Sequence, residues 1–229
     1  MGTVAEVKRE TPTGRSIVID LPGWPGNIAG QHVDVRLTAP DGYQASRSYS
    51  VASSGPAPRL QLAVDRLPGG EVSPFLVDDL RVGDQLELRG PLGGWFVWKP
   101  IEARPVQLIA GGSGVVPLVA MIRSHAASGS EVPMQLLYSV RTPADRFFAD
   151  ELETLDNVSY VYTRATPPNW PVKPGRVTPE VLAQFTIPAA QTPAVFVCGP
   201  TGFVEAVASA LVDQGHNPAS VKTERFGGK

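Results

Sequence analysis

The sequence predicts a two-domain protein, in which a small antiparallel β-barrel is followed by an α/β domain with a parallel sheet. The first hundred residues contain short strand-like runs separated by glycine- and proline-rich turns. After Arg104, apolar strands alternate with helices. The 229 residues are enough for two cores. Because Lys99 and Pro100 interrupt both patterns, we expect the domains to cover residues 1–101 and 102–229.

Six strands are expected in the barrel. They alternate in part between apolar and polar residues, and turns such as 40–42 and Gly55-Pro56 separate them. A short helix with Ser73 near its start is expected over Val72–Leu80. The expected strands are Thr3–Lys8, Arg15–Leu21, Gln31–Leu37, Ala45–Ala52, Arg59–Asp65 and Gln85–Arg89.

The α/β domain is expected to contain five strands and four helices. The strands are Val106–Ala110, Met134–Val140, Ser159–Thr163, Ala194–Cys198 and Ser220–Arg225. The helices are Val116–His125, Pro143–Leu155, Pro179–Phe185 and Gly202–Gln214. Ligands of such sheets bind at the carboxyl ends of the strands, so functional residues are expected at those ends.

Composition excludes several classes of function. The net charge of −2 gives no basic surface for nucleic acid. The single cysteine, Cys198, excludes an internal disulfide and a cysteine-ligated iron–sulfur cluster, and the three histidines have no metal-ligand spacing. No signal peptide is visible, and glycines and a proline break the longest apolar stretch, Val106–Ile122. We therefore expect a cytoplasmic protein without membrane insertion; its oligomeric state stays open.

The tetrapeptide Arg47-Ser48-Tyr49-Ser50 is the most informative local feature. It places a cation, an aromatic face and hydroxyl groups at the end of a strand. Alternation along the strand turns Arg47 and Tyr49 to one side and Ser48 and Ser50 to the other. A planar cofactor that carries phosphate could use all three kinds of group. The alternative is an ordinary strand with an exposed arginine.

Three glycine turns also stand where ligands bind. Residues 69–73 lead into the expected barrel helix and could bind an anion, although Ser73 could instead be a simple N-cap. Residues 111–117 join a strand to a helix, and their glycines would let the backbone approach a pyrophosphate. Residues 198–200 end another strand, where Cys198 could be a small core residue beside a ligand.

Charged residues complete the candidates. Arg141, Arg164 and Arg176 follow or border two strands of the α/β domain and could hold a phosphate monoester, or they could be solvated surface residues. Glu224 and Phe226 lie at the end of the chain. They could reach back over a cofactor, or they could simply end an edge strand.

Taken in order, these motifs resemble the ferredoxin–NADP reductase superfamily, specifically its bacterial oxygenase-reductase branch. The resemblance covers nearly the whole chain. It rests on RSYS (47–50), GGEVS (69–73), GGSGVVP (111–117), YSVRTPADRFFADEL (138–152), CGP (198–200) and ERFG (224–227). It implies a flavin-binding barrel followed by a nicotinamide-nucleotide domain.

The resemblance also implies roles for single residues. In the barrel, Arg47 would meet the flavin phosphate, Tyr49 would pack on the isoalloxazine, and Ser50 would hydrogen-bond near flavin N5. The expected catalytic residues are Ser50, Cys198 and Glu224, the last two beside the nicotinamide. The remaining expected cofactor-binding residues are Ser48, Gly69, Gly70, Val72, Ser73, Gly112, Ser113, Gly114, Pro117, Gly199, Pro200 and Phe226.

The implied reaction is hydride transfer from nicotinamide C4 to flavin N5, followed by transfer of single electrons to a separate iron–sulfur or haem protein. FAD is favoured over FMN. Thr163-Arg164, Arg176 and Arg141 favour NADPH over NADH, although Thr178 stands where such relatives often have a tyrosine. Many relatives carry an iron–sulfur domain, and the one cysteine of this chain is too few to hold its cluster. Two alternatives stay open: a free-standing flavin or ferric-chelate reductase, and a nucleotide-binding subunit without turnover.

Overall fold

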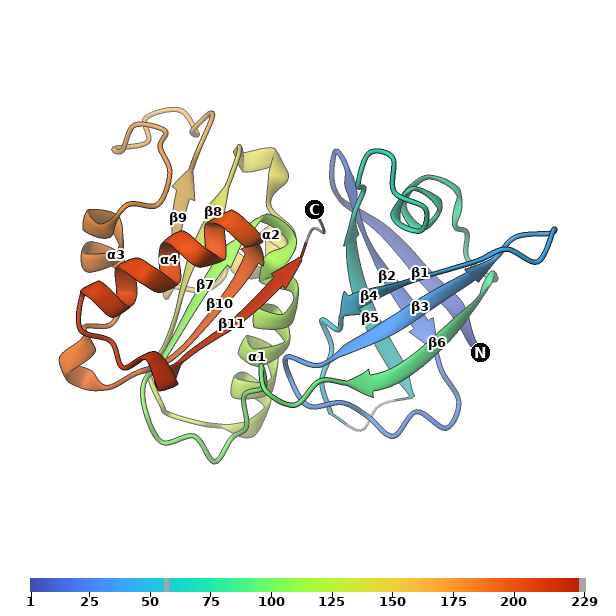
Figure 1. Ribbon diagram of the computed structural model, residues 1–229, viewed down its shortest axis with the longest axis horizontal. Helices are drawn as coiled ribbons and strands as arrows, with labels where there is room; N and C mark the ends of the chain where they lie inside the picture. Colours follow the sequence, from blue (N-terminus) through green and yellow to red (C-terminus); the bar gives the residue numbers. More distant parts are fainter. Residues whose placement is uncertain (56–57, 227–229) are drawn as a thin grey trace.

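Two β-sheets lie side by side in the computed structural model, which describes residues 1–55 and 58–226 (Figure 1). One sheet has six strands and the other has five. The proline of the expected Gly55-Pro56 turn and Gly227 of the ERFG motif lie outside the described residues. The last strand of the five-stranded sheet runs toward the six-stranded one, so the end of the described chain lies between the two sheets.

The N-terminal sheet is antiparallel and barrel-like, as the sequence predicts. Its strands follow the order β4-β3-β6-β1-β2-β5. The two end strands approach each other through a bridge between Val51 and Leu62, which closes the sheet on itself. The strands are β1 (Gly2–Thr11), β2 (Gly14–Asp20), β3 (His32–Thr38), β4 (Gln44–Ser50), β5 (Arg59–Asp65) and β6 (Gln85–Leu92).

The helix expected over Val72–Leu80 is present, with small shifts at its two ends. Ser73 and Pro74 are α-helical and continue into a five-residue π-helix, η1 (Phe75–Asp79), which has no side-chain cap. The hydroxyl of Ser73 accepts a hydrogen bond from the backbone N–H of Leu67 at 3.0 Å. Ser73 therefore holds the preceding turn together and does not cap a helix.

The C-terminal sheet is parallel, with the order β11-β10-β7-β8-β9. Its strands are β7 (Val106–Gly111), β8 (Met134–Val140), β9 (Val158–Tyr162), β10 (Ala194–Pro200) and β11 (Val221–Phe226). Helix α1 (Val115–Ser128) covers the face toward the barrel, and α3 (Pro179–Phe185) and α4 (Thr201–Asp213) cover the other (Figure 1). Four short helical turns connect these elements: η2 (Gly112–Gly114), η3 (Pro143–Asp145), η4 (Ala189–Gln191) and η5 (Pro218–Ser220). Among the described residues, no helix is long and apolar enough to cross a membrane.

The expected helix over Pro143–Leu155 is wrong. The segment forms η3 and then only a short α2 (Ala149–Leu152), with Phe148 between them at a φ of +55°. The reason is contact with the barrel. The carboxylate of Glu10 accepts the backbone N–H of Phe148 at 3.1 Å, and the Phe147 ring lies against Gly14, where a Cβ atom would be 2.2 Å from it. Both phenylalanines therefore pack at the interface of the domains.

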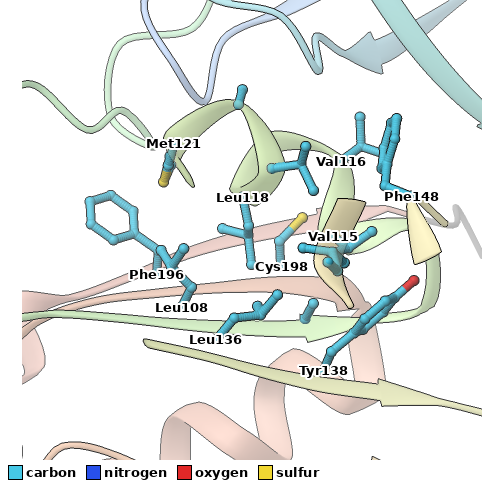
Figure 2. Close-up of a cluster of buried hydrophobic side chains, with 14 of the residues drawn as sticks. Leu108, Val115, Val116, Leu118, Met121, Leu136, Tyr138, Phe148, Phe196 and Cys198 are labelled. Atoms are coloured by element: carbon cyan, nitrogen blue, oxygen red, sulfur yellow. The ribbon is translucent and has the colours of Figure 1, made fainter. Parts of the chain in front are cut away.

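The larger apolar core crosses from one domain into the other. Helix α1 packs its apolar side onto β7, β8 and β10, and Figure 2 shows Leu118 and Met121 of α1 above Leu108 and Phe196 of the sheet. The same cluster includes residues that precede the parallel sheet: Ala29, Ala52, Ala63, Phe96 and Trp98. The barrel keeps a second core of its own. The two domains therefore share buried apolar surface.

Candidate active site

The carboxyl ends of the parallel strands open into a cavity of about 220 Å³ that both domains line. The α/β domain contributes Gly112, Ser113 and Arg141 among others, and the barrel contributes Thr11, Thr13 and Asp65. Pro200 at the end of β10 and Phe226 at the end of β11 also line it. A ligand in this cavity would contact both domains, at the strand ends where ligands of parallel sheets bind.

The glycine turn 111–114 is shaped for a close approach of its backbone to other groups. A Cβ atom on Gly112 would meet nothing within 4 Å, so the space beside it is open, and its φ of +56° suits glycine. A Cβ atom on Gly114 would lie 2.3 Å from the carbonyl oxygen of Cys198, so only glycine fits there. Pro117 lies buried in the first turn of α1, a 14-residue helix whose positive dipole end points at the turn. This arrangement fits a pyrophosphate.

The three arginines that were expected to hold a phosphate lie at the same edge of the sheet. The backbone N–H of Arg164 donates to the carbonyl of Arg141 at 2.9 Å, so these two residues are neighbours. Gly175 donates to the carbonyl of Tyr162 at 3.0 Å, which brings the adjacent Arg176 back to the end of β9. All three residues are exposed. Arg141 lines the shared cavity together with Thr163.

The tetrapeptide 47–50 ends β4, and two of its side chains already have partners. Arg47 Nη2 donates to Glu71 Oε2 at 2.5 Å, and Arg47 Nη1 donates to the carbonyl of Ser46 at 2.7 Å. Ser48 donates to Asp34 Oδ1 at 2.6 Å, so its hydroxyl is used within the sheet. Tyr49 packs against the barrel core, and burial raises its pKa to about 12. The ring of Tyr49 is thus fixed and neutral.

Two groups of the turn 69–73 that could meet an anion already have hydrogen-bond partners close by in the chain. The backbone N–H of Gly70 donates to the carbonyl of Leu67 at 3.0 Å, and Gly69 has a φ of +73°. The side chain of Val72 is buried in the barrel core, and the Ser73 hydroxyl accepts from Leu67. The charged side chain of this turn is Glu71, which is exposed and points to Arg47.

Cys198 and Glu224 lie opposite each other on the neighbouring strands β10 and β11. The thiol of Cys198 is buried in the apolar cluster under α1, close to Leu118 in Figure 2. Burial is the main cause that raises its pKa well above the usual value, and the nearby Glu224 adds to it. The thiol is therefore neutral. The next residue, Gly199, packs its backbone closely against Gly111.

Glu224 carries the most perturbed carboxyl group of the site. Burial raises its pKa from 4.5 to about 7. Its Oε1 lies 4.0 Å from His32 Nδ1, and its Oε2 is buried without a hydrogen-bond partner among the described residues. A buried oxygen of this kind is costly unless another group satisfies it. The side of the site that faces the barrel thus fits a ligand with a hydrogen-bond donor.

His32 was not identified from the sequence. It lies directly opposite Ser50 in the β3–β4 pair, so His32, Ser50 and Glu224 come together where the barrel meets β11. No local signal could have found it, because the contact depends on strand register and on the docking of the two domains.

Arg123 of α1 is a second residue that the sequence did not reveal. Its guanidinium donates to both carboxylate oxygens of Glu151 at 2.8 and 2.6 Å. It also donates to the carbonyl of Ala52 at 3.1 Å and to Gln61 Oε1 at 2.7 Å, both in the barrel half. Its carbon Cζ lies 5.1 Å from the centre of the Phe148 ring. One side chain thus connects the helix that follows the turn 111–114 to the segment that follows Ser50.

Family models match both halves of the chain. Residues 12–97 match an oxidoreductase FAD-binding domain, and residues 108–209 match an oxidoreductase NAD-binding domain. The toluate 1,2-dioxygenase electron transfer component of Pseudomonas putida is 33% identical over 203 residues, which are 87% of this chain and 58% of that protein. The chain thus spans less than two thirds of this relative.

This chain spans a larger share of two further proteins. NADH-cytochrome b5 reductase 1 of Aspergillus oryzae is 30% identical over 87% of this chain and 71% of that protein. The FAD/NAD-binding domain of nitric oxide dioxygenase from Vibrio cholerae superposes with a TM-score of 0.86 and 26% identity, over 99% of this chain and 98% of that one.

A FAD-binding barrel joined to an NAD-binding α/β domain around a shared cavity defines a class, the two-domain flavoprotein oxidoreductases. Three observations support this class: the order of the motifs, the strand order of both sheets, and the similarity to these relatives. The chain belongs to the ferredoxin–NADP reductase superfamily.

Proposed function

We propose that the protein is a flavin-dependent NAD(P)H reductase that passes electrons to a separate iron–sulfur or haem protein. The observation that carries the proposal is the cavity shared by the two domains. A nicotinamide nucleotide on the turn 111–114 would be held at the strand ends that face the barrel. Two reactants fixed in one geometry react much faster than when free in solution.

The residues present fit a flavin on the barrel side. Arg47 is a cation in β4, Tyr49 is an aromatic ring fixed by packing, and Glu224 Oε2 is a buried acceptor without a hydrogen-bond partner in the part of the chain that the structure describes. When bound, the flavin supplies the step between a two-electron donor and one-electron acceptors. No protein nucleophile is required, which agrees with the buried, neutral thiol of Cys198.

The protein's own task in this reaction is to hold the reactants and a proton. The pKa of Glu224, at about 7, allows its carboxyl group to keep or release a proton near neutral pH. Ser50, the last residue of β4, is paired with His32 of β3, and His32 Nδ1 lies 4.0 Å from the Glu224 carboxylate. We assign proton transfer at this place to Glu224 and Ser50. Cys198 and Phe226 are assigned to contact with the nicotinamide side.

For the nucleotide, we propose NADPH as the preferred donor. The support is the grouping of Arg141, Arg164 and Arg176 at the ends of β8 and β9. Exposed guanidinium groups in such a group can bind the additional phosphate of NADPH through charge-assisted hydrogen bonds. The similarity to an NADH-dependent relative makes NADH the competing donor.

For the acceptor, the toluate dioxygenase component supports an oxygenase system, because that relative is named as its electron transfer component. The b5 reductase relative supports a haem acceptor. We propose a small iron–sulfur or haem protein as the partner.

The test starts with the absorbance spectrum of the purified protein, alone and after addition of FAD. Flavin absorbance that is bleached by NADPH in stopped flow, faster than by NADH, is the expected result. A protein that binds neither FAD nor FMN would contradict the proposal. Reduction of ferredoxin and of cytochrome by the flavin-loaded protein then distinguishes the two classes of acceptor.

A further inference from the structure

The carboxylate of Glu71 lies at the cation that was expected to hold the flavin phosphate. Glu71 Oε2 accepts from Arg47 at 2.5 Å, and Glu71 Oε1 accepts from the phenol of Tyr43, also at 2.5 Å. Hydrogen bonds from Tyr43 and Arg47, together with the charge of Arg47, hold the pKa of Glu71 below its usual range. Glu71 is therefore negative at neutral pH, next to the place where the flavin phosphate is proposed to bind.

The position of Glu71 follows from the turn that carries it. The turn is closed by the hydrogen bonds from Gly70 to the Leu67 carbonyl and from Leu67 to the Ser73 hydroxyl, both at 3.0 Å. Val72, the next residue, is buried in the barrel core. The backbone on both sides of Glu71 is thus anchored, and its side chain is directed toward Tyr43 and toward Arg47 in the middle of β4.

We propose that Glu71 makes the flavin site selective for FAD over FMN; this inference rests on the proposed flavin site. At neutral pH a phosphate monoester, as in FMN, carries a charge of about −1.5 to −2. The pyrophosphate of FAD has about the same total charge, but it is divided between two phosphates, so the phosphate beside Arg47 would carry only one of the charges. A carboxylate that shares Arg47 with the phosphate repels the more highly charged monoester more strongly.

The side chains around Arg47 limit how the repulsion can be avoided. Arg47 uses Nη1 for the Ser46 carbonyl and Nη2 for Glu71, so a phosphate has to share the guanidinium with Glu71 or displace it. Displacement also breaks the hydrogen bond from Tyr43. Because both side chains of the ion pair are about half exposed, with 55% and 44% of their area accessible, the effect is moderate.

The test compares the dissociation constants of FAD and FMN, measured by fluorescence titration of the flavin-free protein. In Glu71→Gln, we expect FMN to bind about fivefold more tightly and FAD about twofold more tightly. Glu71→Lys should shift the ratio further in the same direction, so that preference follows the charge at this position. High salt should reduce the differences between the variants, because it screens exposed charges.

Glu87→Gln is the matched control. Glu87 is also a partly exposed carboxylate paired with an arginine of the barrel, Arg36, and both residues lie outside the motifs 47–50 and 69–73. This substitution should leave both constants unchanged. Equal changes for FAD and FMN in the Glu71 variants, or no change, would overturn the inference while the flavin site stands. Failure of every variant and of the unchanged protein to bind any flavin would instead overturn the proposed function on which the inference rests.

Discussion

Two of the three glycine turns, both proposed to lie at phosphate groups, are built in different ways. The turn 69–73 of the barrel is closed by its own hydrogen bonds and presents a charged side chain, Glu71. The turn 111–114 of the α/β domain presents backbone and open space beside Gly112, directly before a long helix. The barrel turn thus acts through side-chain charge, and the other turn acts through backbone shape. Similar sequence patterns do not imply similar sites.

The largest effect is expected from added volume at the second turn. In Gly114→Ala, the new Cβ atom would lie 2.3 Å from the Cys198 carbonyl oxygen, so β10 and the start of α1 must separate. We expect a loss of about 3 kcal/mol in the free energy of unfolding, measured by urea denaturation.

Gly70→Ala is the matched change in the barrel turn, where the nearest atom would be 3.1 Å away. It should cost less than about 1 kcal/mol. Equal losses at the two positions would show that the turns do not differ in shape as described.

The next largest effect concerns the carboxyl group of Glu224, which is largely buried between the two domains. The pKa of Glu224 is 4.5 ordinarily and about 7 in the folded protein, so the folded state holds this proton more tightly than the unfolded state does. Stability therefore falls as pH rises from about 4.5 to 7, by about 2 to 3 kcal/mol from this group alone. Glu224→Gln should remove this part of the pH dependence. If the stability of the two proteins changed with pH in the same way, the pKa of Glu224 would not be raised in the folded protein.

A change at Arg123 tests how the halves are held together. Arg123→Gln leaves the carboxylate of Glu151 and the carbonyl of Ala52 without their donor. We expect a loss of about 2 kcal/mol in stability. Reduction of bound flavin should also slow, although the affinity for each cofactor is kept.

The control is Lys8→Ala, which removes an ion pair with Asp150 across the same interface. Both of its side chains are exposed, at 61% and 89%, so its loss should cost close to nothing. If both variants slow flavin reduction equally, Arg123 has no special part in positioning the domains.

The smallest effect is expected at the phosphate of the nucleotide. Arg164→Ala should raise the KM for NADPH about tenfold, equivalent to about 1.4 kcal/mol, and leave the KM for NADH unchanged. Steady-state kinetics with both nucleotides give the answer. An equal loss for both would place Arg164 away from the additional phosphate.

Strand positions were predictable because each strand is encoded locally. β5 and β8 begin and end where alternation and turns place them. The interruption of the helix expected over Pro143–Leu155 was not predictable, because Glu10, far away in the chain, holds the N–H of Phe148. His32 and Arg123 were missed for the same reason: their partners come from the other domain. The roles assigned to Ser50, Cys198 and Glu224 stay predictions.

The apolar cluster that runs from α1 to Trp98 and Ala29 has a consequence for how the molecule melts. Neither half can open without exposing side chains that the other covers, such as Phe96 and Trp98. The protein should therefore unfold in a single calorimetric transition, although it is built from two sheets. A chain cut between residues 101 and 102 should yield two fragments that aggregate separately and regain solubility only when mixed.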